Sequence, residues 1–418
     1  MARIFYFIIL SFILFWGCIP PPSQPPTQDV LSVRVLLAEI SNMDSMLFGD
    51  DYSLKSEEAL YDFGSSNRKI YINPLKNGIQ IFNANRNLIY KNEFPIVIQP
   101  VAQTAKFVFR NIPYRGSVIF EQATPSSIYL INKLPLEDYL KGVVPFEIIS
   151  TKENYYQAVK AQAICARTYA YDRIVNPRSK MFDLYGSVMD QVYSGYSNKY
   201  PLANRAVDET RNTILLYEGQ PAKIFYHSTC GGSLESPDKV WDTGEIPFLK
   251  ARKDIIGEQF ACRASPKFRW QEYRTLEQLD SSFALMFNIQ PLKKNPEDTL
   301  NINMRLKILN RTNSGRIDSL LLSHRDTTVI LCGNLIRKFF AWPPGGYLWS
   351  NLFTIHQASD TTIVLNGGGY GHGVGLCQYG AMQMAADGYQ YFSILIHYFP
   401  DIILGKINQL QERNERPL

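Results

Sequence analysis

The segment Asn366–Gly388, NGGGYGHGVGLCQYGAMQMAADG, constrains the fold of this chain more than any other. Six glycines fall within nine residues and surround Tyr370 and His372. The preceding residues, Thr361–Leu365, are β-branched or apolar and predict a strand, whereas Leu376–Ala386 has apolar residues at helical spacing and is followed by Gly388, a helix-ending signal. The glycines therefore belong to a strand-to-helix turn, where backbone without Cβ atoms can approach a ligand and present His372.

A phosphate-binding loop and a purely structural turn are the alternatives to a ligand-binding turn. A phosphate-binding loop is disfavoured, because the glycines do not fit G-x-G-x-x-G in any register and no Lys-Ser/Thr pair follows them. A tight turn with a packed histidine stays open, and the rest of the chain has to decide.

Composition bounds the class of protein. The chain has 418 residues and is 45% hydrophobic, enough for a large core and two or three domains. Its 43 basic and 38 acidic residues give a net charge of +5 and are spread along the sequence. The lack of a basic run argues against nucleic acid as a partner, while a mild positive balance suits an anionic polymer such as cell wall.

The N-terminus carries an export signal. Arg3 precedes the apolar run Ile4–Trp16, and Gly17 and Cys18 follow, so residues 1–17 are interpreted as a signal peptide. The Gly17-Cys18 pair resembles the lipobox of bacterial lipoproteins, in which the cysteine is lipid-modified, although Phe15 stands where Leu is usual. Lipidation at Cys18 would anchor the protein to a membrane, with residues 18–30 as a Pro-rich linker. The alternative is an ordinary secretion signal in which Cys18 is incidental.

Export changes the interpretation of the other cysteines. Cys230 and Cys262 lie in polar, loop-like sequence and are a disulfide candidate in an oxidising compartment. Cys165 and Cys332 lie in helical or apolar segments and are expected as buried thiols, and Cys377 opens the helix after the glycines. No C-x-x-C, H-E-x-x-H or Cys/His cluster with zinc spacing occurs, so neither a metal site nor a cofactor is expected.

The pattern of segments predicts an α+β fold. Residues 31–133 form a strand-rich N-terminal region, residues 134–405 a mixed α/β core, and residues 406–418 a polar tail. In the core, Ser150–Ile174 is a predicted helix whose Ser150 and Glu153 form a capping box, and Leu202–Asn212 is a second helix. A strand pair follows with Gly219 in its turn.

Five motifs occur in a fixed order: LPLEDYLKGVVPFEI, AVKAQAICARTYA, DQVYSG, AVDETRNTILLYEGQPAKIFYHSTCGG, and GGGYGHGVGLCQYGAMQMAADG. Together they resemble the stage II sporulation protein D / amidase-enhancer (SpoIID/LytB) family over roughly Leu31–Leu404. The resemblance implies an extracytoplasmic peptidoglycan protein whose core encloses a glycan groove. The family's sporulation members are lytic transglycosylases that act on glycan strands without stem peptides.

The resemblance assigns the catalytic acid to Glu147. The family's motif is V-P-x-E-M, and here it is Val144-Pro145-Phe146-Glu147 with Ile148 in place of Met. A lytic transglycosylase needs one carboxyl group, because the muramic 6-hydroxyl is the internal nucleophile, unlike the paired carboxylates of ordinary glycosidases. Apolar neighbours (Val143, Val144, Phe146, Ile148, Ile149) would raise its pKa, whereas a helix beginning near Thr151 would lower it. The alternative role of Glu147 is that of a helix-entry residue.

Other site residues are implied by the same resemblance. Tyr370, His372, Gln378 and Tyr379 match the family's glycine-rich motif and are expected in the sugar-binding groove. Arg167 and His227 are also expected to contact substrate, although Arg167 needs an acidic partner that the sequence does not identify.

Some positions depart from the family or are interpreted differently. Glu137 and Asp138 are interpreted as first-turn acids of a short helix. The Cys and His residues that hold zinc before Q-V-Y in some sporulation members are missing here. A general envelope role is therefore favoured over sporulation.

Two functions remain open. The first is a lytic transglycosylase with Glu147 as general acid and base. The second is a non-catalytic wall-binding protein that enhances a separate cell-wall amidase. Both imply peptidoglycan glycan strands as the partner and an extracytoplasmic location, and the signal ending at Cys18 adds a lipid anchor in the bacterial cell envelope.

Overall fold

The computed structural model describes residues 31–49, 52–55, 60–62, 68–92, 94–291 and 304–410. The predicted signal peptide (1–17), the linker (18–30) with Cys18, and residues 411–418 of the predicted tail lie outside the described residues. Within the described part, no helix combines the length and apolar character needed to cross a membrane.

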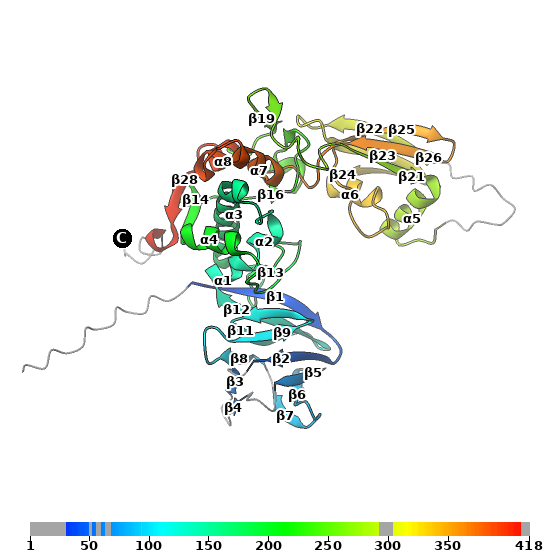
Figure 1. The fold of residues 1–418 in the computed structure, drawn as a ribbon. Coiled ribbons are helices and arrows are strands. Elements are labelled where there is room, and N and C mark those ends of the chain that lie inside the picture. Colours follow the sequence, from blue (N-terminus) through cyan, green and yellow to red (C-terminus); the bar gives the residue numbers. More distant parts are fainter. Residues whose placement is uncertain are drawn as a thin grey trace, which may run out of the picture. The chain divides into compact units, whose positions relative to one another are not determined.

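The N-terminal region is built from strands, as predicted. A seven-stranded sheet has the order β13-β1-β12-β11-β8-β3-β4, and a six-stranded sheet has the order β10-β9-β2-β5-β6-β7 (Figure 1). The strands are β1 (Ser32–Ile40), β2 (Asp44–Phe48), β3 (Tyr52–Lys55), β4 (Leu60–Asp62), β5 (Lys69–Leu75), β6 (Gly78–Phe82), β7 (Leu88–Asn92), β8 (Ile96–Pro100), β9 (Lys106–Phe109), β10 (Ile112–Arg115), β11 (Ser117–Thr124), β12 (Ser127–Pro135) and β13 (Leu184–Tyr185).

The core of this region follows from the period of two along a strand. Phe107 and Phe109 of β9 are buried, whereas the alternate residues Lys106 and Val108 are exposed and partly exposed. Phe107 stacks on Tyr114 of β10, with 5.3 Å between ring centroids, and contacts Phe48 at 6.1 Å. Because buried aromatic rings contribute large apolar areas, this cluster accounts for much of the region's stability.

Helices dominate the next part of the chain. They are α1 (Leu136–Lys141), α2 (Val144–Glu147), the 3₁₀ turn η1 (Glu153–Tyr155), α3 (Tyr156–Val175) and α4 (Pro201–Glu209), joined later by α7 (Gln378–Ala386) and α8 (Tyr391–Tyr398). The helix α3 contacts α1, α2, α4, α7 and α8 (Figure 1). Its run of small residues lets these neighbours approach closely, so the helix is buried along most of its length.

The predicted capping box at the start of this helix is wrong. A 3₁₀ turn precedes α3, which begins only at Tyr156, and Ser150 Oγ is buried with no hydrogen-bond partner among the described residues. A capping box does occur at α5 (Leu276–Phe287), where Thr275 Oγ1 accepts from the Gln278 N–H at 3.2 Å. The local pattern at Ser150 was therefore overridden by tertiary packing.

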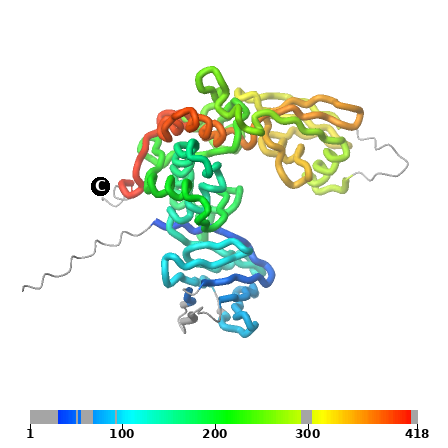
Figure 2. The backbone as a smooth tube through the Cα atoms, viewed as in Figure 1, coloured from blue at the N-terminus to red at the C-terminus, as the bar shows by residue number. Residues whose placement is uncertain are grey.

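The predicted strand pair around Gly219 is confirmed. Strand β14 (Thr213–Tyr217) pairs with β15 (Gln220–Pro221), and Glu218 and Gly219 both have positive φ in a two-residue turn. On its other edge β14 pairs with β28 (Ile403–Lys406), so the red C-terminal segment lies beside the green one in Figure 2. The predicted tail from residue 406 thus begins inside a strand, and Ile407 is buried.

Short ladders connect the remaining segments. Strands β16 (Tyr226–His227) and β27 (Leu376–Cys377) are parallel, while β17 (Ser233–Leu234) pairs with β18 (Arg252–Lys253) and β19 (Ile255–Ile256) with β20 (Gln259–Phe260), both antiparallel. The 3₁₀ turn η2 spans Pro237–Lys239.

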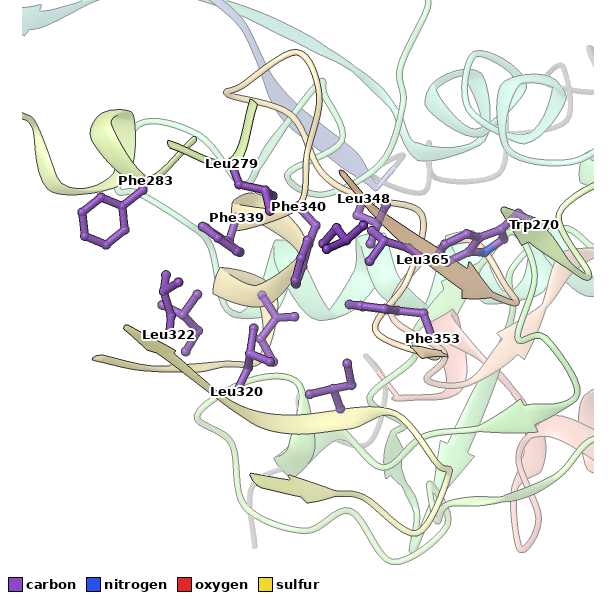
Figure 3. Packing of buried hydrophobic residues seen from close by; sticks show 14 residues of the cluster. Trp270, Leu279, Phe283, Leu320, Leu322, Phe339, Phe340, Leu348, Phe353 and Leu365 are labelled. Carbon is purple, nitrogen blue, oxygen red and sulfur yellow. The ribbon is translucent and has the colours of Figure 1, made fainter. Parts of the chain in front are cut away.

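A second hydrophobic core is formed by buried residues between Trp270 and Leu365. Two three-stranded sheets, β21-β26-β25 and β22-β23-β24, contribute side chains to it together with α5 and α6 (Asn334–Phe339). Phe339, Phe340 and Phe353 converge with Leu320 and Leu365 in Figure 3. The strands are β21 (Trp270–Thr275), β22 (Met304–Arg311), β23 (Ile317–His324), β24 (Thr327–Cys332), β25 (Phe353–Ser359) and β26 (Thr362–Gly367). The chain is therefore an α+β protein, as predicted.

Candidate active site

Glu147 ends the single helical turn α2. Pro145 lies in the first turn of this helix, where a missing N–H costs nothing, and Val144 and Ile148 on either side are buried. Glu147 itself is partly exposed. The sequence V-P-x-E thus produces a short turn anchored by buried neighbours, with Glu147 at its end.

Two distant segments donate hydrogen bonds to this carboxyl group. The backbone N–H of Val192 donates to Oε1 at 2.9 Å, and Gln378 Nε2 donates to Oε2 at 3.4 Å. Val192 belongs to the D-Q-V-Y-S-G motif and Gln378 opens α7 after the glycines. Three of the sequence motifs therefore meet at one carboxyl group.

Burial raises the pKa of Glu147 above its ordinary value. The Val192 N–H, the Gln378 amide and the Tyr226 hydroxyl lower it in part, because they stabilise the carboxylate. The sequence predicted that a helix beginning near Thr151 would lower this pKa, but α3 begins only at Tyr156. The net effect is a raised pKa, which favours the protonated form of the Glu147 carboxyl group.

The apolar surroundings of Glu147 differ in part from those predicted. Val143, Val144 and Ile148 are buried, but Phe146 and Ile149 are 38% and 40% exposed and provide no enclosed environment. Phe146 instead contacts Tyr200 edge to face, with 5.4 Å between the ring centroids.

A layer of hydrogen bonds lies behind Glu147. Gln191 accepts from the Tyr139 hydroxyl at 3.0 Å and donates to the Tyr226 oxygen at 2.8 Å. Gln191 is 1% exposed, so this network is shielded from water and holds Tyr226 beside the acid. No role for Gln191, Val192 or Tyr226 was predicted from the sequence. The Q-V-Y motif was the available signal for Gln191 and Val192, and the IFYHSTCGG segment was the signal for Tyr226.

The glycine-rich segment forms the predicted strand-turn-helix. Strand β26 ends at Gly367 and α7 begins at Gln378, after Cys377 as its N-cap; Gly388, with φ of 92°, follows the end of the helix. Tyr370 pairs with Thr229 through two backbone hydrogen bonds of 2.7 and 3.0 Å. Its ring is 43% exposed and packs edge to face on Trp349 at 5.0 Å.

His372 and His227 lie against each other, with 5.4 Å between ring centroids. His372 also packs on Trp241 at 4.8 Å and accepts the Val374 N–H at Nδ1. Burial lowers the pKa of His372 to about 3, and burial holds the pKa of His227 well below its usual value, so both rings are neutral at pH 7. The residue of this segment that reaches Glu147 is Gln378; a place for His372 in the same groove stays a prediction.

The other two predicted contacts on this side differ in exposure. His227 is buried, and its Nδ1 lies 3.0 Å from the Val374 carbonyl. Tyr379 is partly exposed, and its backbone N–H donates to Ser228 at 3.1 Å. Tyr379 is thus better placed than His227 to meet a ligand.

The prediction that Arg167 contacts substrate is wrong. Its side chain is fully buried and forms a two-pronged ion pair with Glu137, at 2.9 and 2.7 Å. It also donates to the carbonyls of Val207 and Thr213. Glu137, expected only as a first-turn acid, is the acidic partner that the sequence did not identify.

The cysteines also depart from expectation in part. Cys165 is buried as predicted, but Cys332 is exposed because β24 leaves alternate residues on an open face. Cys230 and Cys262 are free thiols with their sulfurs 3.4 Å apart, beyond the S–S bond length of about 2.05 Å. Their disulfide stays a prediction.

The arrangement suits general acid chemistry. Glu147 is a partly exposed residue whose carboxyl group has a raised pKa, with each oxygen accepting from a donor, and the aromatic residues Phe146 and Tyr370 are exposed. Such rings stack on apolar ligand faces, including the faces of sugars.

Comparison with known proteins agrees with the motifs. A family model described as stage II sporulation protein matches residues 124–217, which include Glu147 and Val192. A domain of unknown function (DUF8618) matches residues 248–375, which include the second hydrophobic core.

Three relatives illustrate the range of similarity. An uncharacterised protein of Brachyspira hyodysenteriae is 30% identical over 74% of this chain and 77% of its own length. The stage II sporulation protein D of Bacillus subtilis is 26% identical over 64% of this chain and 74% of its own length. The amidase enhancer of the same organism is 27% identical over 63% of this chain, but the match covers 40% of that longer protein.

Proposed function

Because this chain belongs to the stage II sporulation protein D family, we propose that it is a peptidoglycan lytic transglycosylase with Glu147 as general acid and base. The observation that carries the proposal is the environment of Glu147. Glu147 is partly exposed, and its carboxyl group has a pKa raised by burial and accepts hydrogen bonds from Val192 and Gln378. The substrate is proposed to be glycan strands without stem peptides.

The reaction needs one carboxyl group. Protonated Glu147 gives its proton to the oxygen that leaves with GlcNAc as the bond from C1 of MurNAc breaks. The 6-hydroxyl of the same MurNAc attacks C1, and the Glu147 carboxylate accepts the proton of that hydroxyl. A 1,6-anhydro ring forms, no water is consumed, and the acid is regenerated.

The neighbouring acidic side chain supports this one-carboxyl scheme. Asp190, two residues before Val192, is paired with Arg178 at 2.6 Å and Arg173 at 3.7 Å, and its side chain is fully buried. An aspartate held in this way is not available to activate water, as the second carboxylate of an inverting glycosidase must.

Two aromatic pairs, each with one exposed and one partly exposed member, suggest how glycan is held. We propose that Phe146 with Tyr200, and Tyr370 with Trp349, stack on sugar rings, and that His372, Gln378 and Tyr379 supply polar contacts. The chain would act outside the cytoplasm, anchored through lipid on Cys18, in a general envelope role.

The second candidate is a non-catalytic enhancer of a cell-wall amidase. The similarity to a protein named amidase enhancer favours it, and a glycan-binding groove would serve either function. The two differ in whether Glu147 performs chemistry.

Digestion of purified glycan, with and without stem peptides, separates them. Wild-type protein should release products with 1,6-anhydro ends detectable by mass spectrometry, and Glu147→Gln should reduce the rate by about 10²–10⁴-fold while glycan binding persists. Glu153→Gln is the control, because its side chain is 68% exposed on the nearby 3₁₀ turn.

Full activity in Glu147→Gln would refute the catalytic assignment. Wild-type protein that forms no anhydro ends, yet binds glycan and accelerates an added amidase, would establish the enhancer function instead.

A further inference from the structure

Four buried side chains from separate parts of the chain meet at one point. They are Cys230, Asp254, Cys262 and Cys377, and one ligand atom of each lies within 4.8 Å of all the others. Each of the four is at most 2% exposed. Three sulfurs and a carboxylate enclosed together suit a shared cation, because a cation would balance the negative charge of thiolates and a carboxylate held away from water.

The distances suit one small ion. The Cys230 and Cys262 sulfurs are 3.4 Å apart, and Asp254 Oδ2 is 3.1 Å from the Cys230 sulfur. Zn–S bonds of about 2.3 Å in a tetrahedron place sulfurs roughly 3.8 Å apart. These two separations are therefore within about half an ångström of those in a tetrahedral site, and all four ligand atoms lie within 4.8 Å of one another.

The groups around the cluster are those that support metal ligands. The backbone N–H of Gly232 donates to the Cys230 sulfur, and that of Cys230 donates to the Cys377 sulfur, both at 3.2 Å. His397 Nε2 lies 2.8 Å from the Asp254 oxygen that does not face Cys230. Such outer contacts orient the ligands of metal sites and tune their affinity.

We propose that Cys230, Asp254, Cys262 and Cys377 bind one structural zinc ion. Three soft thiolates with one carboxylate, four ligands in an enclosed place, match the preferences of zinc. A disulfide between Cys230 and Cys262 would engage two of the four groups, whereas one ion would also engage Cys377 and Asp254. The site also lies on different segments from the family's zinc ligands before Q-V-Y.

The ion would brace the candidate active site. Cys377 is the N-cap of α7 and directly precedes Gln378, which donates to Glu147. Cys230 directly follows Thr229, the backbone partner of Tyr370. Binding the two cysteines through one ion would fix the end of the glycine-rich segment against β16. This consequence rests on the proposed function, whereas the metal site does not.

Metal analysis of the full chain, exported and purified without chelator, tests the site. We expect one zinc per chain in wild type and in Cys332→Ser, a control at an exposed thiol, and loss of most zinc in Cys262→Ser and Asp254→Asn. His397→Gln should retain the site but weaken zinc binding about 10–100-fold in chelator competition.

Cobalt gives a readout that does not depend on the variants folding. Wild type stripped of metal and titrated with Co²⁺ should show thiolate-to-cobalt absorption at one equivalent. Glu147→Gln should hold the same zinc, so that a failure of the catalytic proposal is distinguishable from a failure of the metal site.

Two results would overturn the proposal. One is wild-type protein without metal whose peptide map links Cys230 to Cys262. The other is metal-free protein with free thiols that gives no cobalt absorption.

Discussion

Replacing Arg167 by Met should severely destabilise the protein. The guanidinium is fully buried and makes two hydrogen bonds to Glu137, while its remaining donors face the Val207 and Thr213 carbonyls and Thr210 Oγ1 at 3.0–3.2 Å. Methionine fills a similar volume but offers no donor. The main effect is therefore electrostatic.

The expected loss of stability follows from the Glu137 carboxylate, which Arg167→Met leaves buried without its main partner. Glu137 has a side chain only 10% exposed, and after the change its chief remaining partner is the Asn212 N–H at 3.2 Å. Breaking a buried pair in this way costs about 3–5 kcal/mol. Because proteins have roughly 5–15 kcal/mol of stability in total, this is a large fraction.

Removing both charges should be far milder. In Glu137→Leu/Arg167→Met no buried charge is left unpaired, and replacing a whole buried pair by apolar residues is often neutral or stabilising by about 1–4 kcal/mol. The double variant should therefore be considerably more stable than Arg167→Met. Arg205→Met is the control, because the Arg205–Glu153 pair is exposed on both sides and its loss should change stability far less.

Urea unfolding at pH 7, followed by far-ultraviolet circular dichroism, measures these free energies. If Arg167→Met unfolded at nearly the same urea concentration as Arg205→Met but failed to bind glycan, Arg167 would belong to the groove and the structural role would be refuted.

Three further predictions concern the site and the anchor. Activity should fall as pH rises through the raised pKa of Glu147. Because Gln378→Leu removes a donor to the carboxylate, it should move this fall in kcat/KM to higher pH, and a shift to lower pH would contradict the assignment. His372→Ala should reduce turnover more than thermal stability. Gly371→Val should reduce both, because the φ of Gly371 is 113° and a Cβ added there would lie 2.8 Å from the His227 Cβ. Equal melting temperatures for Gly371→Val and wild type would exclude this steric role of Gly371. Cys18→Ala should leave the precursor uncleaved or release the protein from membranes, and a mature N-terminus elsewhere without acyl groups would disprove the anchor.

Local structure was largely predictable where one short segment decides it. The β-branched residues before the glycines form β26, the helix after them ends before Gly388, and the turn at Gly219 joins two strands. In each case a residue's own conformational preference acts within a few neighbours. The capping box at Ser150 and the buried thiol at Cys332 were wrong, because the environment of a side chain depends on what packs against it.

The candidate site was predictable only in part. The resemblance of the motif around Glu147 to a known family pointed to this residue as the candidate acid. The sequence could not show that Val192 and Gln378, 45 and 231 residues away, would donate to it. Gln191 and Tyr226 were missed for the same reason. Hydrogen bonds between distant segments have no periodicity along the chain.

The sequence by itself determined the motifs and the α+β class, since these depend on residue type and local order, and the motifs carry the resemblance that proposes Glu147 as the acid. Only the tertiary structure decided that Arg167 pairs with Glu137 in the core and that Cys230, Asp254, Cys262 and Cys377 converge. Cys230 and Cys377 are 147 residues apart, and no spacing rule covers that separation. Such clusters arise because folding brings distant segments together to bury apolar surface, and the polar groups carried with them must then find partners inside.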